Sequence, residues 1–480
     1  MKTVKPLDLA FLLTESSSRC MHMCAFMLFD PPARERETFV PRLLTAYRQS
    51  EIAAPFNQKL KWLGKGVAAW ETVEPDLNYH LRHIAIPKPG TMKQFYENIS
   101  FINSTLLDRG HPLWECYVIE GLENGRFALM IKIHHALIDG EAGLRVLRGF
   151  LSDSPRDKTL RAPWMPLAQP KPKRRGASGT AMERAQQVLG RLRKLPGDLI
   201  GMGGEVVNLG AQGLNLRPRN SALPFAARRT LFNNQAQSAE RRYANCELSL
   251  DRVVAIAKAS ATSINDVLMT AIDAALHSYL ELRQQPTGKP LVAIMPMSLR
   301  AEGESVEGNQ VTVDLIPMGL PQASLNERLQ QIHAATQRAK EKGRALPRVV
   351  RDFYALFVFG STTASAVASV FAKLPSSNLV ISNMKGPTEP LYLGGASMLA
   401  FHGLPIVPPG GGLNVTFASV NRSVCLGVGA APEAVDDPLL LTQLIAQSLN
   451  ELETEMLGKT TPRRRKTTST IRDKTKEKLA

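Results

Sequence analysis

Strand-like and helix-like segments alternate along two long stretches of the chain, residues 1–162 and 233–458. Alternation of this kind predicts a mixed α/β (α+β) fold in which a sheet and its helices share one core, and its occurrence twice predicts two domains. A chain of 480 residues is long enough to form both cores. We therefore expect an N-terminal domain at 1–162 and a C-terminal domain at 233–458.

Residues 163–232 differ from both stretches in composition, because they contain the basic run Pro170-Lys171-Pro172-Lys173-Arg174-Arg175 followed by Gly and Ser. This texture is typical of a linker. Within it, Met182, Ala185, Leu189 and Leu192 would share one face of a helix, with basic side chains opposite. Two interpretations remain open: a helix docked on the two domains with a solvated basic face, or a helix in direct contact with anionic lipid.

The net charge of +16 suggests nucleic acid or an anionic membrane as a partner, but its location decides between them. Residues 156–229 hold fifteen Lys and Arg against four Asp and Glu, and the polar tail 459–480 holds nine against two. The rest of the chain is almost neutral. A basic tail with few apolar residues is expected to be disordered. Without aromatic side chains interleaved among the basic ones, nucleic-acid binding is the weakest interpretation.

Five cysteines are an odd number, and only Cys20 and Cys24 lie close together in the sequence. No disulfide framework or zinc-binding spacing is apparent, so we expect no metal. The chain has no run of 18 apolar residues and no signal peptide near Met1. These features favour a reducing, cytoplasmic compartment.

Several local elements follow from the residue pattern. The segment Cys116–Ile119, a turn at Glu123-Asn124-Gly125 and the alternating segment Phe127–Ile133 predict a β-hairpin. Further predicted elements are helices at 265–280 and from Asp437-Pro438 onward, a strand at 291–296, and a hairpin of 413–420 with 424–428.

The residues with the clearest chemistry follow the strand at 127–133, in the order His134-His135-Ala136-Leu137-Ile138-Asp139-Gly140. An imidazole with a pKa near ~6.5 can accept a proton from an attacking hydroxyl at neutral pH, so His135 is our candidate base. Because side chains alternate along a strand, His134 should face the other way and be held in the structure. Asp139 could brace the loop through an Arg, and Gly140 permits a tight turn into the following helix.

The pattern HHxxxDG is the signature of the CoA-dependent acyltransferase superfamily. The flanking segments resemble the bacterial wax ester synthase/acyl-CoA:diacylglycerol acyltransferase family over residues 5–455. They are Pro6-Leu7-Asp8 with Phe11-Leu12, Met21-His22, Pro75–His80, Leu107-Asp108-Arg109, Pro112-Leu113-Trp114-Glu115, Asn265-Asp266, Pro296–Arg300, Gly308-Asn309-Gln310, Ser382-Asn383, Gly386-Pro387, Pro390-Leu391-Tyr392 and Gly412-Leu413-Asn414. One departure is Lys385, which stands where the family usually has a proline.

The resemblance implies a pseudo-dimer of two chloramphenicol-acetyltransferase-like domains that moves a long-chain acyl group from acyl-CoA to a long-chain alcohol or to diacylglycerol. It implies that His135 acts as the base without a covalent acyl-enzyme, and that acyl-CoA is a co-substrate with no permanently bound cofactor. We place Asn265 at the developing oxyanion. The expected location is cytoplasmic, with peripheral association with the inner face of the membrane or with lipid droplets.

The supporting residues each allow a structural interpretation as well. Asp266 fits a helix-capping pattern with Ser263, so it either only begins a helix or also supports the site. Pro112, Leu113 and Trp114 are expected mainly to pack in the core.

Two other functions compete with the lipid acyltransferase. One is a related acyltransferase that uses another alcohol or an amine as acceptor. The other is a non-catalytic protein of the lipid-droplet surface, against which the intact His135, Asp139 and Gly140 argue.

Overall fold

The computed structural model describes residues 2–4, 6–64, 67–138, 140–166, 222–234, 238–298, 311–347, 350–351, 354, 357–358, 360–361, 374–384, 386, 389–407 and 411–458. The predicted linker helix, most of the linker and the basic tail lie outside these residues, as do Asp139 and Lys385. None of the helices in this part of the chain is long and apolar enough to cross a bilayer.

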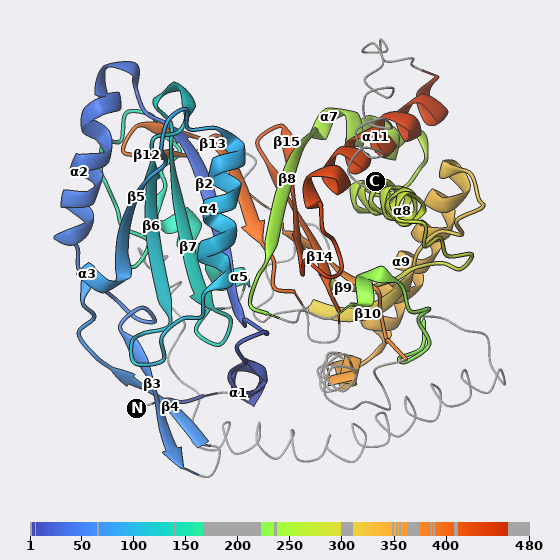
Figure 1. Ribbon diagram of the computed structural model, residues 1–480, viewed down its shortest axis with the longest axis horizontal. Helices are drawn as coiled ribbons and strands as arrows, with labels where there is room; N and C mark the ends of the chain where they lie inside the picture. The colour runs from blue at the N-terminus through green and yellow to red at the C-terminus, as the bar shows by residue number, and fades with distance from the viewer. Residues whose placement is uncertain are drawn as a thin grey trace, which may run out of the picture.

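The fold consists of two six-stranded mixed sheets with helices packed on both, which confirms the predicted α/β class (Figure 1). The N-terminal sheet has the strand order β12-β13-β2-β7-β6-β5. Its strands are β2 (His22–Asp30), β5 (Leu81–Ala85), β6 (Trp114–Glu120), β7 (Phe127–His134), β12 (Tyr392–Leu393) and β13 (Ala396–Leu404). Its helices are α2 (Arg36–Arg48), α3 (Leu77–His80), α4 (Met92–Ser104) and α5 (Gly140–Phe150).

The two faces of this sheet are covered by different helices, because apolar side chains occur at alternate positions of its strands on both faces. Phe127 and Leu129 of β7 pack with α2 and α5, whereas Ala128 and Met130 pack with α4. The same alternation places Lys132 and His134 on the α4 side.

The predicted hairpin around β7 is confirmed. Strands β6 and β7 pair antiparallel, with Trp114 opposite Ile133. At the turn, Asn124 and Gly125 have φ angles of 65° and 68°, which Asn and Gly adopt more readily than other residues.

The C-terminal sheet has the order β10-β9-β11-β14-β15-β8. Its strands are β8 (Arg242–Ser249), β9 (Val292–Ser298), β10 (Val311–Pro317), β11 (Leu379–Met384), β14 (Leu413–Val420) and β15 (Ser423–Ala430). Four helices cover one face: α7 (Leu250–Ala259), α8 (Ile264–Leu282), α9 (Leu325–Ala345) and α11 (Pro438–Leu457). As predicted, Asp437 caps α11 by accepting the Leu440 amide, and Pro438 follows it.

One strand links the halves in a way that the sequence pattern did not predict. Although β13 lies late in the chain, it pairs antiparallel with β2 in the N-terminal sheet, with His402 opposite Phe26 and Leu404 opposite Cys24. The chain then returns to the C-terminal sheet at β14. The N-terminal sheet is therefore completed only when this strand of the C-terminal half is present.

A third, small sheet of order β1-β4-β3 extends from the body below the N-terminal half (Figure 1). Its strands are β1 (Lys2–Thr3), β3 (Gln58–Gly64) and β4 (Val67–Thr72), and α1 (Pro6–Thr14) lies beside it.

Candidate active site

The histidine pair lies where β7 ends, as the sequence predicted. The backbone of each histidine is fixed by a neighbouring segment. The His134 amide donates to the Leu113 carbonyl and the His135 amide donates to the Met21 carbonyl, each at 3.0 Å. After a turn, helix α5 begins at Gly140.

His134 is completely buried, and its ring is held on two sides. The Ala136 amide donates to Nδ1 at 3.1 Å, so this nitrogen carries the lone pair. Nε2 therefore carries a proton, and it lies 3.4 Å from Oε1 of Glu15. This separation is long and poorly aligned for a hydrogen bond, so the contact is mainly electrostatic.

Glu15 connects the segments around the histidine pair. Its Oε1 accepts the Met21 amide at 3.2 Å, and its Oε2 accepts from Arg109 at 3.0 Å. Arg109 also donates to the carbonyl of Leu12. Burial alone would raise the pKa of Glu15, but the contacts with His134, Arg109 and the Met21 amide outweigh it and lower the pKa to about 2. The carboxylate is thus ionised at neutral pH.

Further polar groups lie beneath His134 on the same face of the sheet. His22 is its cross-strand partner and contacts the Asn103 carbonyl through Nε2 at 2.8 Å. Burial and the nearby Lys132 charge lower the pKa of His22 to about 3. The fully buried Lys132 ammonium donates to the carbonyls of Ile102 and Thr105 and lies 3.5 Å from Glu115. These contacts tie β7 to the end of α4.

His135 lies in a more open environment than His134, since it is partly exposed. Its ring stacks on Phe11 of α1, with ring centroids 4.4 Å apart and an interplanar angle of 23°. A partly exposed imidazole is open to a substrate hydroxyl, which is a first condition for a general base. The two histidines therefore differ in environment in the way that strand alternation predicts.

The predicted residues Asn265 and Asp266 lie in the first turn of α8. The Asn265 amide contacts the sulfurs of Met269 and Met295 at 3.4 and 3.8 Å, and its Oδ1 accepts weakly from Asn383 at 3.5 Å. These contacts bring together Asn265 and the Ser382-Asn383 segment, which are far apart in the sequence.

Asp266 is buried and forms the predicted capping box with Ser263. It also accepts from Thr336 at 2.7 Å and lies 2.8 Å from Nδ1 of His333, so it joins α8 to α9. Burial opposes ionisation, but the hydrogen bonds from His333, Ser263 and Thr336 lower the pKa of Asp266 overall. These contacts favour a structural role that fixes the start of α8.

Pro112, Leu113 and Trp114 are buried, and their core packing is as expected. The Trp114 indole donates to the Phe56 carbonyl at 2.7 Å and its ring stacks on His80. Through its carbonyl, Leu113 also holds the His134 backbone.

Sequence reasoning did not identify Glu15 as a site residue. A single glutamate at the end of a short helix carries no local pattern, and its partners lie at distant positions in the chain. Phe11 appears within a segment that resembles the family, but its stacking on His135 becomes evident only in three dimensions.

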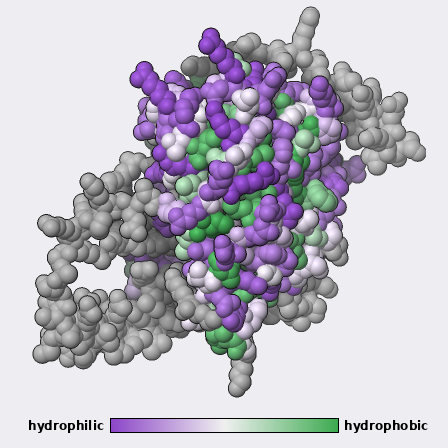
Figure 2. Space-filling model, turned by 90° about the vertical axis from the view of Figure 1, so that its left-hand side faces the viewer, coloured by the Kyte–Doolittle hydropathy of each residue, from purple (hydrophilic) through white to green (hydrophobic). Residues whose placement is uncertain are grey.

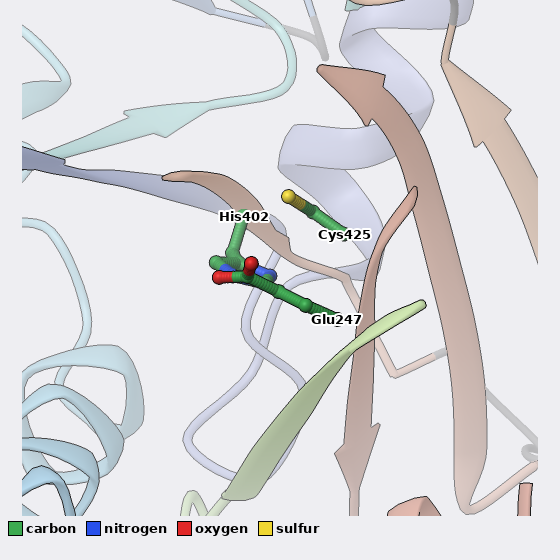
Figure 3. A group of neighbouring side chains, drawn as sticks. All are labelled: Glu247, His402 and Cys425. Carbon is green, nitrogen blue, oxygen red and sulfur yellow. The ribbon is translucent and has the colours of Figure 1, made fainter. Parts of the chain in front are cut away.

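Groups that could hold a metal ion are present at another place in the described structure. Glu247, His402 and Cys425 offer ligand atoms within 4.8 Å of one another, between the two large sheets (Figure 3).

Comparison with known proteins gives consistent matches over both halves. Residues 4–268 match the model of the wax ester synthase/diacylglycerol acyltransferase catalytic domain, and residues 307–453 match that of the corresponding C-terminal domain. A probable diacylglycerol O-acyltransferase of Mycobacterium tuberculosis is 55% identical over 468 residues, covering 96% of this chain and 98% of the relative. The O-acyltransferase WSD of Acinetobacter baylyi is 33% identical over 439 residues, covering 91% and 93%.

Solved structures agree with these matches. A wax ester synthase/diacylglycerol acyltransferase from Marinobacter aquaeolei is 27% identical, with a TM-score of 0.73 over 95% of this chain and all of that one. The first condensation domain of the calcium-dependent antibiotic synthetase is 13% identical, with a TM-score of 0.57 over 94% of this chain and 95% of that one. At 13% identity, the match to the condensation domain shows a shared fold and nothing more.

Proposed function

This chain belongs to the wax ester synthase/diacylglycerol acyltransferase family and is an O-acyltransferase, and on that premise we propose that it moves a long-chain acyl group from acyl-CoA to a long-chain alcohol or to diacylglycerol. The single observation that carries the chemistry is the contrast at the end of β7. His134 is buried and held, whereas its neighbour His135 is partly exposed on a fixed backbone.

In the proposed reaction, a ring nitrogen of His135 removes the proton of the acceptor hydroxyl while the oxygen attacks the thioester carbonyl. The tetrahedral intermediate then expels the CoA sulfur, and the imidazolium returns its proton to that thiolate. Both substrates are bound together, so no acyl group is attached to the protein. Stacking on Phe11 limits the rotation of the His135 ring and keeps it aligned between the two substrates.

Asn265 is proposed to donate to the oxyanion, with Asp266 fixing the helix turn that presents it. Among the described residues, its amide nitrogen donates to weak acceptors, the sulfurs of Met269 and Met295, and these bonds can be exchanged at small cost for a bond to a charged oxygen.

Access to such insoluble acceptors requires a lipid surface, and the β3–β4 hairpin is the described element that fits this role. Trp62, Leu63 and Val67 near its tip have exposed fractions of 42%, 54% and 45%. The hairpin is the lowest coloured part of Figure 1, and Figure 2 shows an apolar projection at that height. Aromatic and apolar side chains on a projecting tip are suited to the boundary between lipid headgroups and acyl chains.

Lys59 and Lys61 lie on the same hairpin, although Lys61 is paired with Glu71. The basic linker and tail add long-range attraction to anionic lipid. We propose that the protein docks peripherally on a membrane or lipid-droplet surface through the hairpin and these basic segments.

The proposed activity is tested by incubating purified protein with labelled palmitoyl-CoA and either hexadecanol or diacylglycerol, and then resolving the neutral lipids. Wax ester or triacylglycerol should form in proportion to the CoA released. Thiol release without a neutral-lipid product would indicate hydrolysis or another acceptor and would overturn the assignment.

The absence of an acyl-enzyme is tested separately by omitting the acceptor. Labelled acyl-CoA alone should leave no label on denatured protein, and no burst of CoA should appear. Stoichiometric labelling of the protein would require a covalent intermediate.

A further inference from the structure

Glu247, His402 and Cys425 come from three strands that meet where the two large sheets contact each other (Figure 3). Cys425 of β15 lies directly opposite Glu247 of β8 in the antiparallel register. His402 belongs to β13, the strand that crosses into the N-terminal sheet. Their side chains converge, and one ligand atom from each lies within 4.8 Å of the others.

The imidazole of His402 is almost fully buried and stacks on Phe26, but its hydrogen-bonding capacity is not satisfied. Its Nδ1 has no hydrogen-bond partner, and its Nε2 lies 3.8 Å from Oε1 of Glu247, beyond hydrogen-bond length. Burying a polar group without a partner costs free energy, so an orphaned ring nitrogen of this kind requires an explanation. A ligand between the three side chains would bind one of the two ring nitrogens.

A neutral imidazole offers its lone pair to a metal ion directly, whereas a thiol loses its proton when it coordinates one.

We propose that Glu247, His402 and Cys425 form a binding site for one divalent ion of the zinc type, with water as the fourth ligand. Sulfur, imidazole nitrogen and carboxylate oxygen are the three donor types that zinc uses in proteins. On binding, one S–H bond breaks, one metal–sulfur bond forms and one proton is released to solvent. The ion, thiolate and carboxylate together carry no net charge, which suits a partly buried position.

The geometry requires a small closure of the site. Ligand atoms on a tetrahedral zinc ion are roughly 3.5 Å apart, given metal–ligand bonds of about 2.0–2.3 Å. The donors therefore have to approach one another by about 1 Å. Glu247 can supply this movement because its side chain is half exposed, and the same opening gives the ion a path from solvent.

The position of the site indicates a structural role. Two of the ligands belong to the C-terminal sheet and the third belongs to the N-terminal sheet. A bound ion would therefore fasten β13 to β8 and β15, and so hold the two halves together.

The experiment uses the full-length protein, freed of metal with a chelator and titrated with Zn²⁺ in competition with a chromogenic chelator. One equivalent should bind, release one proton and raise the thermal midpoint. With Co²⁺ as the probe, a thiolate-to-cobalt charge-transfer band should appear in the wild type and be absent in Cys425→Ser.

Two further variants and one control locate the site. Glu247→Gln changes a half-exposed residue, so the variant should fold. Its Zn²⁺ affinity should fall by at least roughly 10- to 100-fold, because altering a residue that only orients a metal ligand already has an effect of that size. His402→Gln should do the same. Cys246→Ser is the matched control, since this neighbouring cysteine packs against the C-terminal core, and it should leave binding unchanged.

Equal Zn²⁺ affinity in the wild type and Glu247→Gln, or a cobalt spectrum without the thiolate band, would overturn the proposal and indicate adventitious surface binding. These measurements do not depend on acyl transfer, so their outcome is independent of the proposed function.

Discussion

Nε2 of His134 lies 3.4 Å from Oε1 of Glu15, so the end of the first helix contacts the end of the strand that carries the histidine pair. The same carboxylate accepts the amide of Met21, whose carbonyl in turn accepts the amide of His135. One buried charge thereby determines the position of both histidines, although it is in contact with only one of them.

Replacing the proposed base tests the chemistry directly. His135→Ala should lower ester formation by about 10²- to 10⁴-fold, because the acceptor hydroxyl would then keep its proton during attack. The thermal midpoint should change little, since the backbone hydrogen bond to Met21 remains and the ring that is lost is partly exposed, with Phe11 as its stacking partner. Near-normal turnover by folded protein would show that another group is the base.

Replacing His134, the buried neighbour of His135, should affect stability more than activity. His134→Ala should lower the free energy of unfolding by about 2–4 kcal/mol, because it leaves a cavity and removes a partner of the buried Glu15 carboxylate. Activity should fall less than in His135→Ala. Chemical denaturation measures the first effect and steady-state kinetics the second, and an unchanged midpoint would refute the structural role.

Glu15 makes the stability of the protein depend on pH in the acid range. Because its pKa falls from 4.5 in the unfolded chain to about 2 in the folded protein, its contribution is complete above pH 4.5. That contribution is lost as the pH falls toward 2. Glu15→Gln should be less stable at pH 7 and should lose less stability between pH 5 and pH 3 than the wild type, as measured by denaturant midpoints at each pH. Parallel profiles for the two proteins would contradict the assignment.

Asn265→Ala should lower kcat by about 10²- to 10³-fold with little change in the KM for acyl-CoA, as expected for a donor that acts on the oxyanion. Asp266→Asn is the informative comparison, because it disturbs the capping box and the contact with His333 and should mainly lower stability. If Asn265→Ala kept full kcat, another group would have to supply the donor.

Docking on lipid is tested by the paired change Trp62→Ser and Leu63→Ser, which removes the apolar side chains from the hairpin tip. Flotation with anionic liposomes should decrease about 10-fold or more, since each large apolar side chain contributes roughly 1.5–3 kcal/mol when fully buried. Turnover of detergent-dispersed substrate should stay close to that of the wild type. Removal of residues 459–480 should also weaken flotation, but mainly at low salt. Unchanged flotation in both variants would refute peripheral docking by these segments.

Local patterns predicted much of the fold because they depend on neighbouring residues. The β6–β7 hairpin follows from alternation and a turn at Asn124-Gly125, and the first residues of α8 and α11 follow from N-capping residues. The histidine pair at the end of β7 follows from the same alternation.

The features that escaped prediction depend on contacts between distant residues. Nothing in the sequence near Ala396–Leu404 indicates that this strand joins β2 instead of its neighbours in the chain. Likewise, Glu15 acquires its role only through Arg109 and His134, and Glu247 comes near His402 only after β13 has crossed between the sheets.

The crossing of β13 also has a consequence for biosynthesis. As the chain leaves the ribosome, β2 and β7 are made long before β13, so the N-terminal sheet has to wait for its neighbouring strand with one edge of β2 open. An open edge is a template for wrong pairing with other nascent chains. A gene fragment that stops before residue 396 would encode a protein with that edge permanently exposed. We therefore expect the isolated N-terminal half to aggregate when it is expressed alone.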